Sequence, residues 1–91
     1  MAATVRDNSP LNRFELDADG GTAFAYYQRA DGVITFTHTE VPPALSGRGV
    51  GSALVKGALE AARAQKLKVA AKCPFVAAYM AKHPEFNDLL V

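Results

Sequence analysis

The segment that most constrains this chain is Val41-Pro-Pro-Ala-Leu-Ser-Gly-Arg-Gly-Val-Gly-Ser52, which joins a β-branched run to a helix-like run. Glycines at positions 47, 49 and 51 leave its backbone uncovered by side chains. The start of a helix presents N–H groups without internal partners, together with a partial positive charge. Phosphate groups bind readily at such a place, so the segment predicts a site for a phosphorylated cofactor. The alternative is a plain turn from strand to helix.

Length and charge limit the kind of protein. A chain of 91 residues makes one domain, and we expect a loose segment over residues 1–10 before a single domain over residues 11–91. The net charge of +1 gives no general attraction to nucleic acid, so any anion site must be local.

The composition also argues against several kinds of site. One cysteine and two histidines exclude a disulfide framework and argue against a metal site. The first ten residues lack the apolar core of a secretory signal, and no apolar run is long enough to span a membrane. We therefore expect a cytoplasmic protein that binds neither nucleic acid nor membrane.

Residue patterns predict four strands and two helices. The strands alternate in polarity or are rich in β-branched and aromatic residues, and they cover residues 12–17, 22–29, 33–40 and 67–72. The helices cover residues 49–65 and 74–82, and Pro84 ends the second one. Short turns make the first three strands an antiparallel meander, and the first helix is a right-handed crossover to a parallel fourth strand. The predicted fold class is α+β, with a mixed sheet and a second helix at the C-terminus.

Two common nucleotide motifs do not match the glycine run. A P-loop requires Gly-Lys-Ser/Thr at the helix start, and Gly51-Ser52 lacks the lysine. A dinucleotide fingerprint requires a third glycine, and Leu54 stands in its place. A meander also precedes the turn, whereas a dinucleotide site belongs to a doubly wound sheet.

The run Ser46-Gly-Arg-Gly-Val-Gly51, between a strand and a long helix, resembles the Gln/Arg-x-x-Gly-x-Gly/Ala signature of the GNAT acyltransferases, although Ser46 replaces Gln or Arg. Residues 37–52, followed by the segment Cys73-Pro-Phe through Phe86, are similar to the minimal single-domain GNAT-like N-acetyltransferases of YjdJ type. The resemblance extends from about residue 12 to the C-terminus. It implies a GNAT-like sheet without the N-terminal helices that shape the acceptor pocket of longer GNAT enzymes.

The resemblance implies acetyl-CoA or coenzyme A as the cofactor. Its diphosphate would be held by backbone N–H groups of residues 47–52, and its pantetheine arm would pair with the backbone near Thr39 and Val41. Tyr79 and His83 lie one turn apart on the second helix, and they either contact the cofactor or simply pack. The expected cofactor-binding residues are Thr39, Val41, Ser46, Gly47, Arg48, Gly49, Val50, Gly51, Ser52, Cys73, Tyr79 and His83.

Acetyl transfer to an amine needs a proton acceptor near the thioester. Ile34, Phe36, His38 and Glu40 alternate along the third strand, so a regular strand places them on one face. This spacing predicts His38 and Glu40 as catalytic bases. The alternative is a bulge near Thr37, like the one that GNAT proteins carry on the corresponding strand, which would leave both side chains exposed.

Cys73 is the third candidate catalytic residue. It follows the fourth strand and precedes Pro74 at a helix start, a position that favours the reactive thiolate form. Three roles stay open: a nucleophile that carries the acyl group, a residue that orients the acetyl carbonyl, or a small buried apolar side chain.

We expect an acetyl-CoA-dependent N-acetyltransferase that moves an acetyl group from a thioester to an amine. The alternatives are a CoA- or acyl-CoA-binding module with little catalysis and an interaction domain without a cofactor. The amine acceptor stays open among peptides, polyamines and small metabolites.

Overall fold

The computed structural model describes residues 5–45, 47 and 49–91. One five-stranded sheet has the order β1-β2-β3-β4-β5, and only β4 and β5 are parallel neighbours. Its strands are β1 (Arg6–Asn8), β2 (Arg13–Ala18), β3 (Gly21–Ala30), β4 (Val33–Glu40) and β5 (Lys68–Ala71). The helices are α1 (Val50–Ala64) and α2 (Pro74–Lys82), with short 3-10 helices at Ser9–Leu11, Pro43–Leu45 and Pro84–Leu89.

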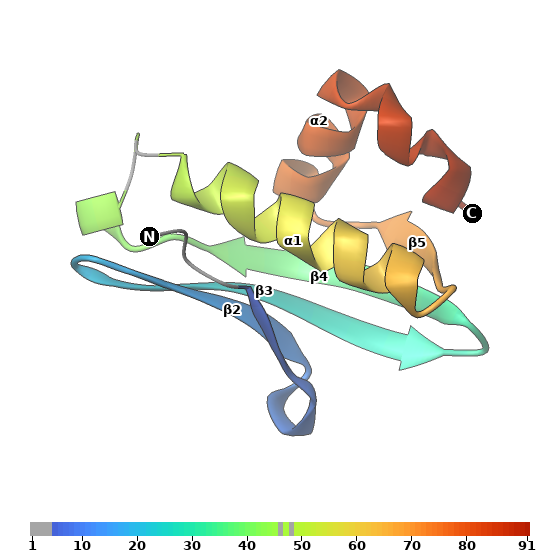
Figure 1. Cartoon of the computed structure of the whole chain (residues 1–91), viewed down its shortest axis with the longest axis horizontal. Coiled ribbons are helices and arrows are strands. Elements are labelled where there is room, and N and C mark those ends of the chain that lie inside the picture. The colour runs from blue at the N-terminus through green and yellow to red at the C-terminus, as the bar shows by residue number, and fades with distance from the viewer. Residues whose placement is uncertain (1–4, 46, 48) are drawn as a thin grey trace.

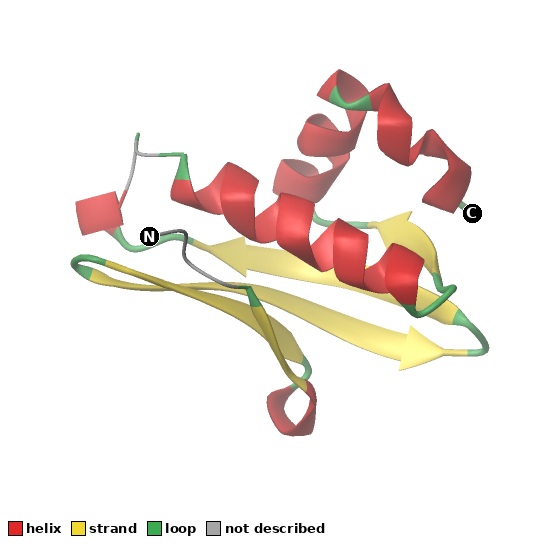
Figure 2. Ribbon diagram, in the orientation of Figure 1, coloured by secondary structure: helices red, strands yellow, loops and turns green. Residues whose placement is uncertain are grey.

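Both α-helices cover the same face of the sheet (Figure 1). Helix α1 crosses from the end of β4 to the start of β5, and its predicted apolar stripe is buried against the sheet: Leu54, Val55, Ala58, Leu59 and Ala62. Neither α1 nor α2 lies on the opposite face (Figure 2), and we call it the open face. The predicted α+β fold class, with a meander and one parallel strand, is confirmed.

Of the predicted loose segment over residues 1–10, residues 1–4 lie outside the described residues, and most of the remainder has regular structure. Arg6–Asn8 forms an edge strand antiparallel to β2. Val5 packs against Gly57 of α1, where a Cβ atom would lie 2.7 Å from the Val5 Cβ. Hydrogen bonds from its side chains to β2 and β3 hold this strand in place. Because its sequence is polar, it shows no apolar alternation from which a strand could be predicted.

The segment after α2 also contributes to the core. Helix α2 ends at Lys82, as predicted from Pro84, but the chain then forms a 3-10 helix that buries Phe86 and Leu89. The Arg63 guanidinium of α1 donates to both Asp88 carboxylate oxygens, at 2.7 and 3.0 Å. This pair fastens the C-terminal segment to α1.

A bulge interrupts β4 in front of the site. Tyr27 pairs with Phe36 and Tyr26 pairs with His38, so Thr37 is an additional residue on β4. The side chains beyond it change faces, because each added residue reverses the alternation of a strand. Thr39 now pairs with the buried Ala25 and faces the helices, whereas His38 and Glu40 lie on the open face.

Candidate active site

The glycine segment forms a compact turn at the carboxyl end of β4. Leu45 anchors it from a 3-10 helix and is fully buried. Gly47 and Gly49 have φ angles of 77° and 74°, a left-handed conformation that suits glycine because other residues are strained there. Of the predicted cofactor residues in this segment, Ser46 and Arg48 lie outside the described residues.

Helix α1 starts immediately after this turn. Its first backbone bond runs from the Ala53 N–H to the Gly49 carbonyl, at 3.0 Å. The N–H groups of Val50, Gly51 and Ser52 therefore precede the first helical carbonyl partner. They are the donors that the sequence predicted for a phosphate.

A cavity of about 280 Å³ lies beside these donors. It is lined by Val41, Leu45, Gly47, Gly49, Val50, Gly51, Ser52 and Phe75. The Phe75 ring approaches Gly51 so closely that a Cβ at position 51 would lie 2.7 Å from the ring's Cζ. The absence of a side chain at Gly51 therefore sets the width of this cavity.

A second cavity, of about 200 Å³, shares Ser52 and Phe75 with the first. The predicted pair Tyr79 and His83 lines it, with ring centroids 4.0 Å apart and the planes 20° from parallel. Burial, with the nearby carboxylates of Glu85 and Glu60, raises the pKa of the Tyr79 hydroxyl. The hydroxyl therefore stays protonated to a higher pH than that of an exposed tyrosine, and Lys82 also lines the cavity.

Strands β4 and β5 separate beside the first cavity. Their pairing ends at Phe36 and Ala71, and the N–H groups of Lys72 and Cys73 both donate to the Phe36 carbonyl, at 3.1 and 3.0 Å. Beyond this point no described strand pairs with that edge of β4. Cys73 precedes α2 and is only 3% exposed, and its Sγ lies 3.3 Å from the Thr39 hydroxyl.

The chain is similar to known acetyltransferases in sequence and in fold. Residues 13–89 match the family model described as GCN5-related N-acetyl-transferase. The chain belongs to this family. A solved structure of a GCN5-like N-acetyltransferase candidate from Staphylococcus aureus has a TM-score of 0.73 and 30% identity, covering 96% of this chain and 86% of that one. No curated protein sequence matches the chain significantly.

Two of the predicted catalytic residues of this GCN5-related acetyltransferase lie where a regular strand would not put them. The expectation that His38 and Glu40 share the face of Ile34 and Phe36 is wrong, because the bulge at Thr37 turns them to the open face. Their side chains are 60% and 54% exposed, and His38 Nε2 lies 3.6 Å from Glu40 Oε1. The site therefore has two sides, with Thr39 and Cys73 facing the helices and His38 and Glu40 on the open face.

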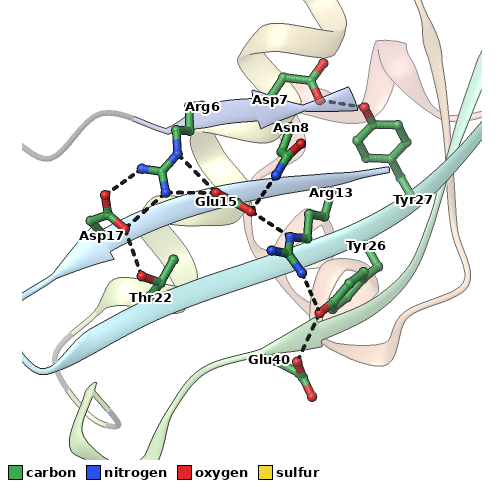
Figure 3. Close-up of polar contacts among 10 residues, drawn as sticks. All are labelled: Arg6, Asp7, Asn8, Arg13, Glu15, Asp17, Thr22, Tyr26, Tyr27 and Glu40. Atoms are coloured by element: carbon green, nitrogen blue, oxygen red, sulfur yellow. Dashed lines mark hydrogen bonds and ion pairs between the residues drawn. The ribbon is translucent and has the colours of Figure 1, made fainter. Parts of the chain in front are cut away.

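The open face of the acetyltransferase carries a connected set of polar side chains (Figure 3). At its centre is Glu15, which is 6% exposed and accepts hydrogen bonds from Asn8, Arg13 and Arg6. The hydrogen bonds from Asn8, Arg13 and Arg6 hold the pKa of the Glu15 carboxyl below its usual value. Arg13 also donates to the Tyr26 hydroxyl at 3.4 Å, which donates to Glu40 at 3.3 Å.

Some residues around the site were missed by reasoning from the sequence. Phe75 borders both cavities on the helix side and is 42% exposed, and Phe24 and Tyr26 lie beside Glu40 and His38 on the open face. The signal available for Phe75 was an aromatic residue directly after Cys73-Pro74 at a helix start.

Among the described residues, no helix has the length and apolar character needed to cross a membrane. No described group of three or more His, Cys, Asp or Glu side chains is arranged to hold a metal ion.

Proposed function

We propose that this chain is an acetyl-CoA-dependent N-acetyltransferase that transfers an acetyl group from the thioester to an amine. The observation that carries the proposal is the cavity at the start of α1, which is lined by the first three helical residues, by the glycines of the turn and by the Phe75 ring. The adjoining aromatic cavity and the gap where β4 and β5 separate offer further space for the cofactor next to this cavity.

The described residues offer partners for three parts of a CoA molecule. The N–H groups of Val50 to Ser52 are donors for the diphosphate, in line with anion binding at helix starts. The rings of Phe75, Tyr79 and His83, with Lys82, offer a surface for the adenosine end. The edge of β4 near Thr39, with Val41 just after the strand, pairs with no described strand and offers backbone partners for the pantetheine amides. The contacts predicted for Ser46 and Arg48 stay predictions.

When bound, acetyl-CoA supplies an acetyl group activated as a thioester. The buried Cys73 favours direct attack by the amine over a route through an acyl-cysteine, because a thiol that is 3% exposed is poorly placed to be acylated and then to meet an acceptor. We assign Thr39 and Cys73 to the wall beside the thioester. Glu40 or His38 accepts the proton that the attacking amine releases, directly or through a water molecule.

The exposure of His38 and Glu40 also supports a second candidate function, a CoA- or acyl-CoA-binding module with little catalysis. A base in contact with bulk water has little of the desolvation with which enzymes adjust catalytic groups. The two functions share the cofactor site and differ in turnover. Mass spectrometry of an amine and peptide panel incubated with acetyl-CoA separates them, since only the enzyme accumulates acetylated products.

Calorimetry with CoA and acetyl-CoA tests both candidates at once. We expect binding in the micromolar range, and no heat with either ligand would reject the cofactor site.

The substitution Gly49→Ala tests the glycine turn, and Gly32→Ala is its matched control. Both glycines have positive φ angles, of 74° and 78°, and neither has an atom within 4 Å of an added Cβ. Each substitution costs about 1–2 kcal/mol of backbone strain. Only Gly49→Ala disturbs the turn before α1, so only it should weaken CoA binding.

A further inference from the structure

We propose that the outer edge of β5 is a docking site for an extended, acidic peptide segment of a partner protein. The site includes a cavity of about 480 Å³ that is bordered by β5, α2 and the segment that follows α2. This cavity shares no lining residue with the two cavities assigned to the cofactor. The inference therefore does not depend on the proposed function.

The backbone of β5 offers hydrogen-bonding groups on this side. Strand β5 is the last strand in the order of the sheet (Figure 1). The N–H groups of Lys68 and Lys72 donate to carbonyls on the β4 side. Backbone groups alternate along a strand, so those of Val69 and Ala71 point to the outer edge. The Val69 carbonyl accepts from the Val91 N–H at 3.1 Å, whereas no described strand pairs with Ala71 on this side.

The chain itself shows that this edge accepts a strand. Leu90 forms an isolated parallel bridge with Val69. Leu90 and Val91 are 43% and 72% exposed, so they cover little of the edge. An extended peptide beside them would pair its own backbone with the N–H and carbonyl groups of Ala71, which is the recognition mode of strand addition.

The cavity next to this edge suits an apolar side chain of such a peptide. Helix α2 lines it with Ala77, Met80 and Ala81, which are spaced three and four residues apart and so share one face of the helix. Met80 is 2% exposed and gives the cavity an apolar floor, while the two alanines are short and exposed. Side chains of a strand alternate between its two sides, so every second residue of the peptide would point into this space.

The charges at the edge favour an acidic occupant. Of the described residues that line the cavity, Lys72 alone is charged, and its side chain has no ion pair or hydrogen bond with the described residues. Lys68, at the other end of β5, is exposed and donates to the Asp88 carbonyl at 2.8 Å. A carboxylate of the peptide would therefore meet an unpaired ammonium group at Lys72. A second copy of the chain would bring the lysines of two β5 strands together, which disfavours pairing between copies.

Amide chemical shifts of the ¹⁵N-labelled full chain test this site with a probe peptide, Glu-Val-Leu-Val-Glu, acetylated and amidated at its ends. We expect the probe to shift the resonances of residues 69–72, 77–81 and 90, with an affinity that falls as salt is added because the lysines are exposed. The charge-reversed peptide Lys-Val-Leu-Val-Lys should bind at least about fivefold more weakly. An acidic peptide that is N-methylated at its three central residues loses the backbone donors of strand addition, so it should leave these resonances unchanged.

Two substitutions with matched controls locate the probe. Lys72→Gln should weaken binding of the acidic peptide about two- to fivefold, whereas Lys66→Gln removes the same charge from an exposed position outside the cavity and should leave binding unchanged. Ala81→Leu places a larger side chain in the cavity and should weaken binding at least about tenfold. Ala64→Leu makes the same change at the exposed end of α1 and should have no effect. Leucine is a good helix former, so we expect both leucine variants to fold, and the dispersion of their amide spectra verifies it.

Several outcomes would overturn the docking site. Shifts that map away from β5 and α2, equal binding of the two charged peptides, or an unchanged affinity in a folded Ala81→Leu variant would each do so. Octanoate that shifts the same resonances while the acidic peptide does not would assign the cavity to a small amphipathic anion. Concentration-dependent sedimentation that Ala81→Leu abolishes would assign the edge to a second copy of the chain.

Discussion

The Thr39 hydroxyl and the Cys73 thiol share a hydrogen bond of 3.3 Å where β4 and β5 separate. Thr39 reaches this position only because the additional residue Thr37 reverses the alternation of β4. The same bulge sends His38 and Glu40 to the other side of the sheet. One inserted residue thus divides the polar groups between the helix-covered face and the open face of the sheet.

Replacement of Cys73 tests its role at the thioester. We expect Cys73→Ala to keep CoA affinity within about twofold, since the donors of the glycine turn are untouched, and to lower the acetylation rate about tenfold through loss of the Thr39 contact. Cys73→Ser retains a hydrogen-bonding group and should recover part of the rate. Acid-quenched wild-type protein should carry no acetyl group by mass spectrometry, and an adduct on Cys73 would establish the acyl-cysteine route instead.

Gly57 offers a test of the N-terminal contact. Alanine is favoured over glycine inside a helix by about 1 kcal/mol. A Cβ at position 57 would lie 2.7 Å from the Val5 Cβ, however, so we expect Gly57→Ala to destabilise the protein by about 1–3 kcal/mol. In a Val5→Gly background the same substitution should become stabilising. Urea denaturation of the four proteins measures the difference, and a stabilised Gly57→Ala single variant would contradict the packing of Val5 on α1.

The raised pKa of the Tyr27 hydroxyl predicts that the free energy of unfolding falls at alkaline pH. Burial, and then its hydrogen bond to Asp7 at 2.5 Å, raise the pKa of the Tyr27 hydroxyl from 10.0 to about 12. The neutral hydroxyl is favoured in the fold, so its contribution is complete below pH 10 and is lost as the pH rises towards 12. Tyr27→Phe should lower stability at pH 7 by about 1–2 kcal/mol and abolish this part of the alkaline decline. Tyr26→Phe, whose hydroxyl bonds are 3.3 and 3.4 Å long, should have a smaller effect on thermal unfolding.

The lowered pKa of the Glu15 carboxyl predicts that the free energy of unfolding falls at acidic pH. Its hydrogen bonds from Asn8, Arg13 and Arg6 lower the pKa of the carboxyl below the ordinary value of 4.5. A lowered pKa in the folded state contributes stability above pH 4.5 that is lost as the pH falls through the folded value. Glu15→Gln should therefore be less stable at pH 7, and its stability should decline less as the pH falls below 4.5. Glu60→Gln, on the exposed side of α1, controls for the loss of one charge; a parallel decline of Glu15→Gln and wild type would refute the assignment.

The main elements could be predicted because their patterns are local. The alternation in residues 12–17 and 33–40 and the apolar stripe of α1 each reflect the side on which a strand or helix meets the core, and the structure has these elements within one or two residues of the expected bounds. The glycine turn was predicted for the same reason, since the left-handed conformations at Gly47 and Gly49 are encoded by the residue type. Strand β1 was missed, because its polar sequence shows no apolar alternation and it is held by ion pairs to Glu15 and Asp17 of β2.

The sequence by itself determined the α+β architecture and the helix start that presents free N–H groups. It also determined the resemblance of the glycine run to an acetyltransferase signature. Only the tertiary structure decided on which face of the sheet each polar side chain lies. Two positions on a strand share a face or oppose each other according to the pairing with the neighbouring strand, and the shift between Tyr26 and Tyr27 is set by contacts across the hairpin. Local alternation carries no record of that shift, so His38, Glu40 and Thr39 could be named from the sequence but not placed.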